Sequence, residues 1–131
     1  MIILIIIVVA ATNRPDMLDA ALIRPGRIDR KIYVPPPDDL SREQIISNEL
    51  KKMPTSNGID ISELVNKSSG FSGAEVVACV SEAALIAIDD EDDFITHQHL
   101  LKAINGIKPQ ITQSMLLFYD QLKKQYSFGG K

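Results

Sequence analysis

The chain has 131 residues, of which 45% are hydrophobic, so it is long enough to fold as one domain with a substantial core. Its formal net charge of -3 excludes the broadly positive surface that general binding to nucleic acid requires. The single cysteine, Cys79, excludes an intrachain disulfide, and together with the two histidines, His97 and His99, it is too little for a metal site.

The first predicted element is a strand. An apolar run from Met1 to Ala11 is rich in isoleucine and valine and does not alternate with polar residues. That pattern is typical of a parallel strand covered on both faces, whereas a membrane-spanning helix needs about 20 residues. Lys31–Val34 is the one further strand candidate, and two strands cannot bury each other. We therefore expect the chain to be the later part of a larger sheet domain.

Polar residues follow the apolar run directly. Asn13 comes at the predicted carboxyl end of the strand, where open α/β sheets present the groups that face a ligand. A short helix is predicted over Asp16–Ile23, ending at a Pro25-Gly26 turn. Arg24 and Arg27 lie three residues apart, and guanidinium groups suit phosphate recognition. Two plainer interpretations stay open: Asn13 as a turn or cap residue, and the arginines as surface ion-pair residues.

A stiff proline link, Pro35–Asp38, separates this part from a second part whose pattern is helical throughout. We predict the domain boundary here, with residues 1–38 before it and residues 39–131 after it. Helices are predicted over residues 41–52, 60–67, from 72 to the acidic turn at 89, over 96–103 and over 112–126, and Thr96 is the predicted cap of the fourth. Ser41 with Gln44 and Ser72 with Glu75 have capping-box spacing, which by itself indicates only where a helix starts.

Five segments occur in order along the chain: A-T-N-R-P-D-x-L-D-x-A-L-x-R-P-G-R-x-D-R, P-P-P-D, S-R-E-Q-I-I, G-F-S-G-A-E-V and S-E-A-A-L-I-A-I. With these segments at these spacings, the chain from Val8 to about Ile107 resembles the AAA family of ATPases. Within the family it is most similar to the second ATPase module of the type II members, in the spermatogenesis-associated/drug-resistance branch related to valosin-containing protein. The resemblance implies the last strands of a parallel, RecA-like P-loop NTPase sheet, an α/β remnant, followed by an all-α AAA lid subdomain.

The resemblance also implies roles for particular residues. Asn13 matches sensor 1, which positions the attacking water against the γ-phosphate of ATP. Arg24 and Arg27 match the two arginine fingers, which reach the nucleotide of an adjacent subunit and stabilise the charge of the transition state.

In the lid, the resemblance places three further residues near the nucleotide. Gly73 and Ala74 match the start of the helix that lies against the adenine and the phosphates, and Ile45 matches an apolar position packed on the adenine. The chemistry agrees, since a helix N-terminus favours anions and glycine permits close backbone approach.

Two motifs of an ATP-hydrolysing module do not occur in the chain. It contains no G-x-x-x-x-G-K-[ST] and no apolar strand that ends in paired acidic residues. The phosphates then have no cradle and Mg²⁺ has no ligand within these residues. We therefore expect this chain to be the C-terminal portion of a AAA module and to hydrolyse no ATP by itself.

For the complete module, the resemblance implies Mg²⁺-bound ATP, neighbouring AAA subunits in a homo-hexamer, and a protein substrate, which for this branch is a pre-ribosomal assembly factor. It implies work in the cytoplasm or nucleus, with no direct contact to nucleic acid or membrane. Two alternatives remain. The chain is a truncated, non-catalytic product that docks on a partner ATPase and offers Arg24 and Arg27, or it is a helical interaction module from Leu40 onward.

Overall fold

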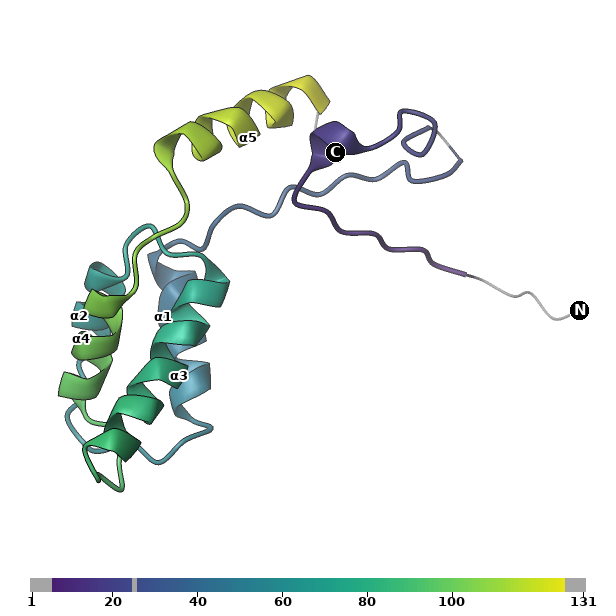
Figure 1. Ribbon diagram of the computed structural model, residues 1–131. Helices are drawn as coiled ribbons and strands as arrows, with labels where there is room; N and C mark the ends of the chain where they lie inside the picture. Colours follow the sequence, from purple (N-terminus) through teal and green to yellow (C-terminus); the bar gives the residue numbers. More distant parts are fainter. Residues whose placement is uncertain (1–5, 25, 127–131) are drawn as a thin grey trace, which may run out of the picture. The chain divides into compact units, whose positions relative to one another are not determined.

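The computed structural model describes residues 6–24 and 26–126 and divides into two compact units (Figure 1). The first unit comprises Met1–Val34 with Ser114–Lys131, and the second comprises Pro35–Gln113. The predicted division of the chain into residues 1–38 and 39–131 stays a prediction. Among the described helices, none combines the length and the apolar composition that a membrane crossing requires.

The second unit is a bundle of four helices: α1 (Asp39–Leu50), α2 (Ile61–Lys67), α3 (Gly73–Asp89) and α4 (His97–Gly106). Helix α3 packs against α1 and α4, and α2 packs against the same two helices (Figure 1). The loop after α1 and the loop after α3 are joined by one parallel bridge between Thr55 and Ile95. The predicted all-helical character of this part is therefore confirmed.

One hydrophobic core lies inside this bundle. Helix α3 supplies apolar side chains at helical spacing, and the side chains of Leu64 and Ala83 are fully buried, at 0% exposure. Burying a side chain such as Leu64 stabilises a fold by roughly 1.5–3 kcal/mol. The core residues are Ile46, Leu50, Leu64, Val65, Phe71, Val76, Cys79, Val80, Ala83, Ala87, Ile95, Leu100, Ala103 and Ile104. The unit thus closes its core with residues from a single continuous stretch.

Side chains at the helix starts satisfy backbone N–H groups that have no partner within the helix. The predicted capping box of Ser72 and Glu75 at the start of α3 is confirmed, and Thr96 caps α4 as predicted. The predicted cap at Ser41 is wrong, because α1 begins earlier. The Asp38 carboxylate accepts the Ser41 N–H at 2.8 Å, so Ser41 lies inside the first turn. An aspartate directly after the prolines is the first good cap that the chain meets.

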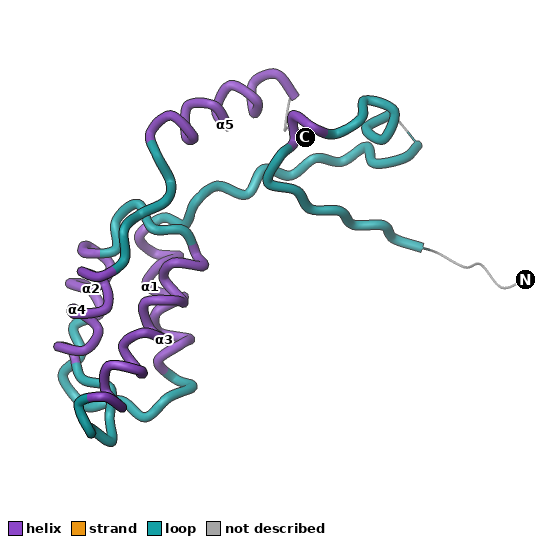
Figure 2. The backbone as a smooth tube through the Cα atoms, in the orientation of Figure 1, coloured by secondary structure: helices purple, strands orange, loops and turns teal. Residues whose placement is uncertain are grey.

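The first unit contains a short 3-10 helix, η1 (Pro15–Met17), and helix α5 (Gln113–Tyr126), and its other described residues form loops (Figure 2). The predicted sheet remnant is not confirmed. Residues 6–11 and 31–34 form no strand, and residues 1–5 of the predicted first strand lie outside the described residues. A strand needs a neighbour to satisfy its backbone, and the described residues provide none.

The predicted helix over Asp16–Ile23 is also wrong. Only three residues form a helical turn, and bends and turns follow up to Arg24. Isolated helices shorter than about 12–15 residues are marginal unless another element covers them. Here Met17 is 73% exposed, so this segment has no such cover.

Candidate functional site

Asn13 lies at an exposed bend just before η1. Its backbone carbonyl accepts a hydrogen bond from the Tyr119 hydroxyl at 2.8 Å. The next residue, Arg14, pairs with Asp16, with 2.8 Å between Nη2 and Oδ2. This pairing raises the pKa of Arg14 and lowers the pKa of Asp16. Within the described part of the chain, the Asn13 side-chain amide makes no hydrogen bond, so it is available to a ligand.

Arg24 and Arg27 lie in a turned segment that we call the arginine loop, residues 19–30. The Arg27 guanidinium donates to the Ala21 carbonyl at 3.0 Å, and the Arg27 amide donates to the Arg24 carbonyl at 3.0 Å. Gly26 has a φ of +83°, a conformation that glycine adopts without strain. Pro25, the other half of the predicted turn, lies outside the described residues.

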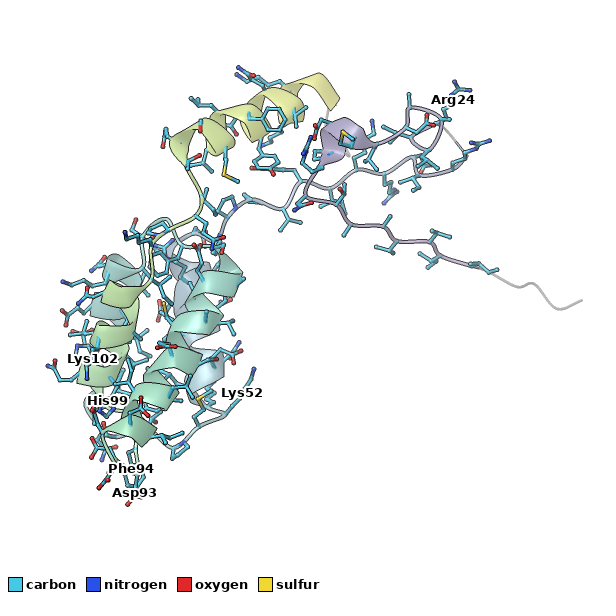
Figure 3. All side chains as sticks on the ribbon, viewed as in Figure 1. Arg24, Lys52, Asp93, Phe94, His99 and Lys102 are labelled. Carbon is cyan, nitrogen blue, oxygen red and sulfur yellow. The ribbon has the colours of Figure 1, made fainter. Side chains whose placement is uncertain are left out.

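The two arginines of this loop differ in what they contact. Part of the Arg27 guanidinium holds the loop together, as described above. The Arg24 side chain extends into solvent (Figure 3), and it forms no ion pair or side-chain hydrogen bond with any other described residue. A free, exposed guanidinium can complete an anion site that another molecule brings to it.

The predicted lid residues lie at the start of α3 and on the neighbouring helix α1. A Cβ added to Gly73 would lie 3.7 Å from Ile45 Cδ1, which is ordinary van der Waals contact, so the structure brings Gly73 and Ile45 together. Ile45 is half-buried and Ala74 is exposed. Neither a close contact nor a positive φ requires glycine at position 73, so the described chain would accept a Cβ there. The lack of a side chain leaves room for close approach from outside.

Glu75 is a buried carboxylate in the first turn of α3, and it stabilises the start of this helix. Its two carboxylate oxygens accept the Ser72 and Gln110 backbone N–H groups, each at 2.7 Å, and the residue is 8% exposed. Burial raises the pKa of this carboxyl, but the hydrogen bonds from Ser72 and Gln110 outweigh that effect and leave the pKa below its ordinary value. The sequence predicts the Ser72 contact from capping-box spacing, but no local pattern indicates Gln110.

Arg42 is a buried charged residue for which the sequence gives little indication. It is 5% exposed, donates to the Pro37 carbonyl at 2.9 Å and reaches the Val65 carbonyl at 3.5 Å. It also pairs with Asp39, three residues earlier on α1. Val65 lies near the C-terminal end of α2, where a positive charge is favoured by the helix dipole. Arg42 therefore anchors the proline link and α2 to α1, and the spacing of Asp39 and Arg42 is the only sequence signal for it.

The two histidines and the cysteine lie in structural environments of the helical unit. His97 Nε2 lies 2.9 Å from Glu63, and His99 Nδ1 accepts the Thr96 N–H at 3.1 Å. Cys79 is buried in the core, and burial raises the pKa of its thiol to about 11. Among the residues that the structure describes, no group of three or more histidine, cysteine, aspartate or glutamate side chains could hold a metal ion.

Comparison with known protein families gives two matches, in chain order. Residues 5–36 match the ATPase family associated with various cellular activities (AAA), and residues 58–102 match the AAA+ lid domain. The first match contains Asn13 and the arginine loop, and the second contains Gly73 and Ala74.

Curated relatives are similar to this chain over most of its length. The human ATPase family gene 2 protein homolog A is 42% identical over 120 residues, which are 90% of this chain and 13% of that protein. The Saccharomyces cerevisiae ATPase family gene 2 protein is 47% identical over 119 residues, 88% of this chain and 15% of that protein. The Archaeoglobus fulgidus cell division cycle protein 48 homolog is 35% identical over 92% of this chain and 19% of that protein.

The chain thus spans between 13% and 19% of the length of these three relatives. The resemblance predicted from the ordered motifs is confirmed by both the family matches and the relatives. The chain belongs to the AAA ATPase family.

Proposed function

We propose that this chain supplies three parts of the nucleotide machinery of an ATP-hydrolysing AAA module. These are a water-positioning side chain, arginines for a neighbouring subunit and the lid surface that faces the nucleotide. The observation that carries the proposal is the order of the two family matches, AAA over residues 5–36 and AAA+ lid over residues 58–102. ATP is the substrate, and the reaction is transfer of its γ-phosphoryl group to water.

Asn13 is proposed to orient the attacking water against the γ-phosphate. Its side-chain amide can donate and accept hydrogen bonds, and no described residue uses either function. Only its backbone carbonyl is engaged, by Tyr119. A side chain that stays free beside a fixed backbone suits a positioning role.

Arg24 and Arg27 are proposed to act as arginine fingers at the nucleotide of an adjacent subunit. The free guanidinium of Arg24 supports this role, because it can pair with phosphate oxygens without breaking an existing contact. Arg27 holds the loop through the Ala21 carbonyl, and this contact limits the directions in which Arg24 is presented. Charge supplied in this way stabilises the transition state more than the ground state.

Gly73, Ala74 and Ile45 are proposed to form the lid surface that contacts ATP. Two observations support this. The backbone at Gly73 is open to close approach, and the N–H groups at the start of a long helix favour an anion. Ile45 beside Gly73 offers an apolar surface for the adenine ring.

The residues of this chain do not fit a Mg²⁺ site. The described part has no suitable cluster of carboxylates, and the sequence has no phosphate-binding G-x-x-x-x-G-K-[ST] motif. We propose that both are supplied by another stretch of the module. By the same argument, residues 6–11 are covered there by further strands, which would bury Ile7 and Val9, now 82% and 86% exposed.

For the assembled protein, we propose a homo-hexameric ring that remodels a protein substrate, a pre-ribosomal factor in the cytoplasm or nucleus. This part rests on the family resemblance, and the similarity to proteins named ATPase family gene 2 supports the choice of branch.

A graft tests the proposed roles. The matching segment of the Saccharomyces cerevisiae ATPase family gene 2 protein is replaced by this chain, and the rate of phosphate release is measured. The rate of the same protein without the segment is subtracted as background. We expect Arg24→Ala to reduce turnover by about 10³–10⁵-fold, the contribution of an arginine finger. Asn13→Ala should also lower turnover strongly, to a residual rate that can still be measured, with ATP still bound, and Lys67→Ala, at an exposed lysine of α2, serves as the control. Full turnover in Arg24→Ala and Asn13→Ala would contradict the proposal.

A second candidate function is a helical module that docks on a partner ATPase without taking part in hydrolysis. The observation that favours it is the closed core of the second unit, which uses only residues between Ile46 and Ile104. It predicts that the graft variants at Asn13 and Arg24 keep their turnover, so the same experiment separates the two functions.

A further inference from the structure

Helix α5 contacts both segments that flank the arginine loop. The Tyr119 hydroxyl donates to the Asn13 carbonyl at 2.8 Å, across 106 positions of sequence. One turn later, Lys123 Nζ lies 5.6 Å from the centre of the Tyr33 ring, in a cation–π contact. Residues four apart lie on one face of a helix, so a single face of α5 reaches both sides of the loop.

Other features of this contact show that it is packed rather than incidental. Leu122, between the two contacting residues, is 8% exposed. The Phe118 and Tyr119 rings lie edge to face with their centres 5.6 Å apart. Burial, followed by the nearby Asp120 and Tyr119, raises the pKa of Tyr33. Tyr33 itself is half-buried, and Lys123 of α5 lies over its ring.

We propose that Tyr119 is a positioning residue for Asn13, and that α5 acts as a brace holding Asn13 and the arginine loop in place. This inference rests on the proposed function of Asn13. Between the two contacts, the described residues 14–24 and 26–32 contain little regular structure of their own, so fixing the two ends of this segment removes much of its freedom. The Tyr119 hydroxyl fixes the Asn13 backbone and leaves the Asn13 side chain free to face the water.

The first test examines the contact in the chain itself by NMR. Asn13-Arg14 is the only Asn-Arg pair in the sequence, so labelling asparagine with carbonyl ¹³C and arginine with ¹⁵N gives one carbonyl–amide resonance for this peptide bond. We expect Tyr119→Phe to shift that resonance, because the carbonyl loses its hydrogen bond, and we expect Gln121→Ala, at an exposed position of α5, to leave it in place. An unchanged resonance in Tyr119→Phe would overturn the proposal.

The second test measures function in the grafted ATPase. Tyr119→Phe should lower kcat by about threefold to tenfold, the value of one hydrogen bond, and leave KM for ATP unchanged. In an Asn13→Ala background the same substitution should lower turnover no further, because Tyr119 acts through Asn13. An equal loss in both backgrounds would indicate a merely structural role and overturn the proposal.

The single variant Asn13→Ala distinguishes failure of the proposed function of Asn13 from failure of the positioning role of Tyr119. If that variant retains full turnover, the proposed function of Asn13 fails, and the positioning role fails with it. If it loses turnover while Tyr119→Phe is fully active, only the positioning role is overturned.

Discussion

The two units use apolar residues in opposite ways. In the second unit Ile46 is 3% exposed and Leu64 is 0% exposed, whereas in the first unit Ile7 and Val9 are 82% and 86% exposed. A helix satisfies its own backbone, so four consecutive helices can close a core with residues from one stretch of chain. A strand needs a neighbouring strand before it can be buried. The helical unit therefore closes its core with its own residues, whereas residues 6–11 are left exposed by the rest of the described chain.

The largest expected effect comes from removing a core side chain in the second unit. Leu64→Ala leaves a cavity in the bundle, and we expect it to lower the free energy of unfolding by about 2–5 kcal/mol. The matched substitution in the first unit, Ile7→Ala, should change it by no more than about 0.5 kcal/mol, because the side chain is already in solvent. Urea denaturation followed by far-UV circular dichroism measures both. Equal losses of unfolding free energy in the two variants would contradict the difference in apolar burial between the units.

A smaller effect is expected from the buried carboxylate of Glu75. Each of its oxygens accepts one backbone N–H, and Glu75→Gln can keep only one of these two hydrogen bonds. We expect a loss of about 1–3 kcal/mol of unfolding free energy at neutral pH. Glu82→Gln, at an exposed carboxylate of the same helix, should leave the unfolding free energy almost unchanged.

The same pair of variants tests the pKa of Glu75. Because the folded state lowers this pKa, the carboxylate contributes its full stability above the ordinary value of 4.5 and loses it as the pH falls through the lower, folded pKa. The difference in unfolding free energy between the wild-type chain and Glu75→Gln should therefore become smaller in acid. A gap that stays constant from neutral pH to about pH 3 would show that the pKa is not lowered.

The smallest effect on folding, and a large effect on solubility, is expected from removing residues 1–9. The unfolding free energy of the helical unit should change by less than about 0.5 kcal/mol, because no core residue is lost. Solubility should rise, since residues 6–9 are exposed and an uncharged, β-branched sequence promotes aggregation. Light scattering against concentration measures this, and no gain in solubility would argue against the exposed apolar run as the cause.

The sequence predicts well what depends on neighbouring residues. The caps at Ser72 and Thr96 follow from side chains that reach only three residues along the chain, and the structure confirms both. The prediction fails where two local signals compete, as when Asp38 rather than Ser41 caps α1. It also fails where a segment lacks tertiary cover, as in the predicted helix over Asp16–Ile23.

Two hydrogen bonds at or beside the candidate site residues join positions that are far apart in the sequence. Gln110 reaches Glu75 across 35 positions, and Tyr119 reaches Asn13 across 106. No periodicity or spacing rule connects residues so far apart, so only the fold reveals them. The site residues Asn13, Arg24, Arg27, Gly73, Ala74 and Ile45 were predicted by resemblance to the AAA family, and their roles stay predictions.

The central claim is that the arginine loop works at the nucleotide of a neighbouring subunit, and mixing two inactive grafted ATPases tests it most directly. Asn13→Ala disables a subunit's own site but leaves its arginines for a neighbour, and Arg24→Ala does the reverse. In an equal mixture, about a quarter of the interfaces in a ring combine an intact Asn13 with an intact Arg24, so we predict recovery of about that share of phosphate release. A mixture as inactive as its two components, although mixed rings form, would contradict the account.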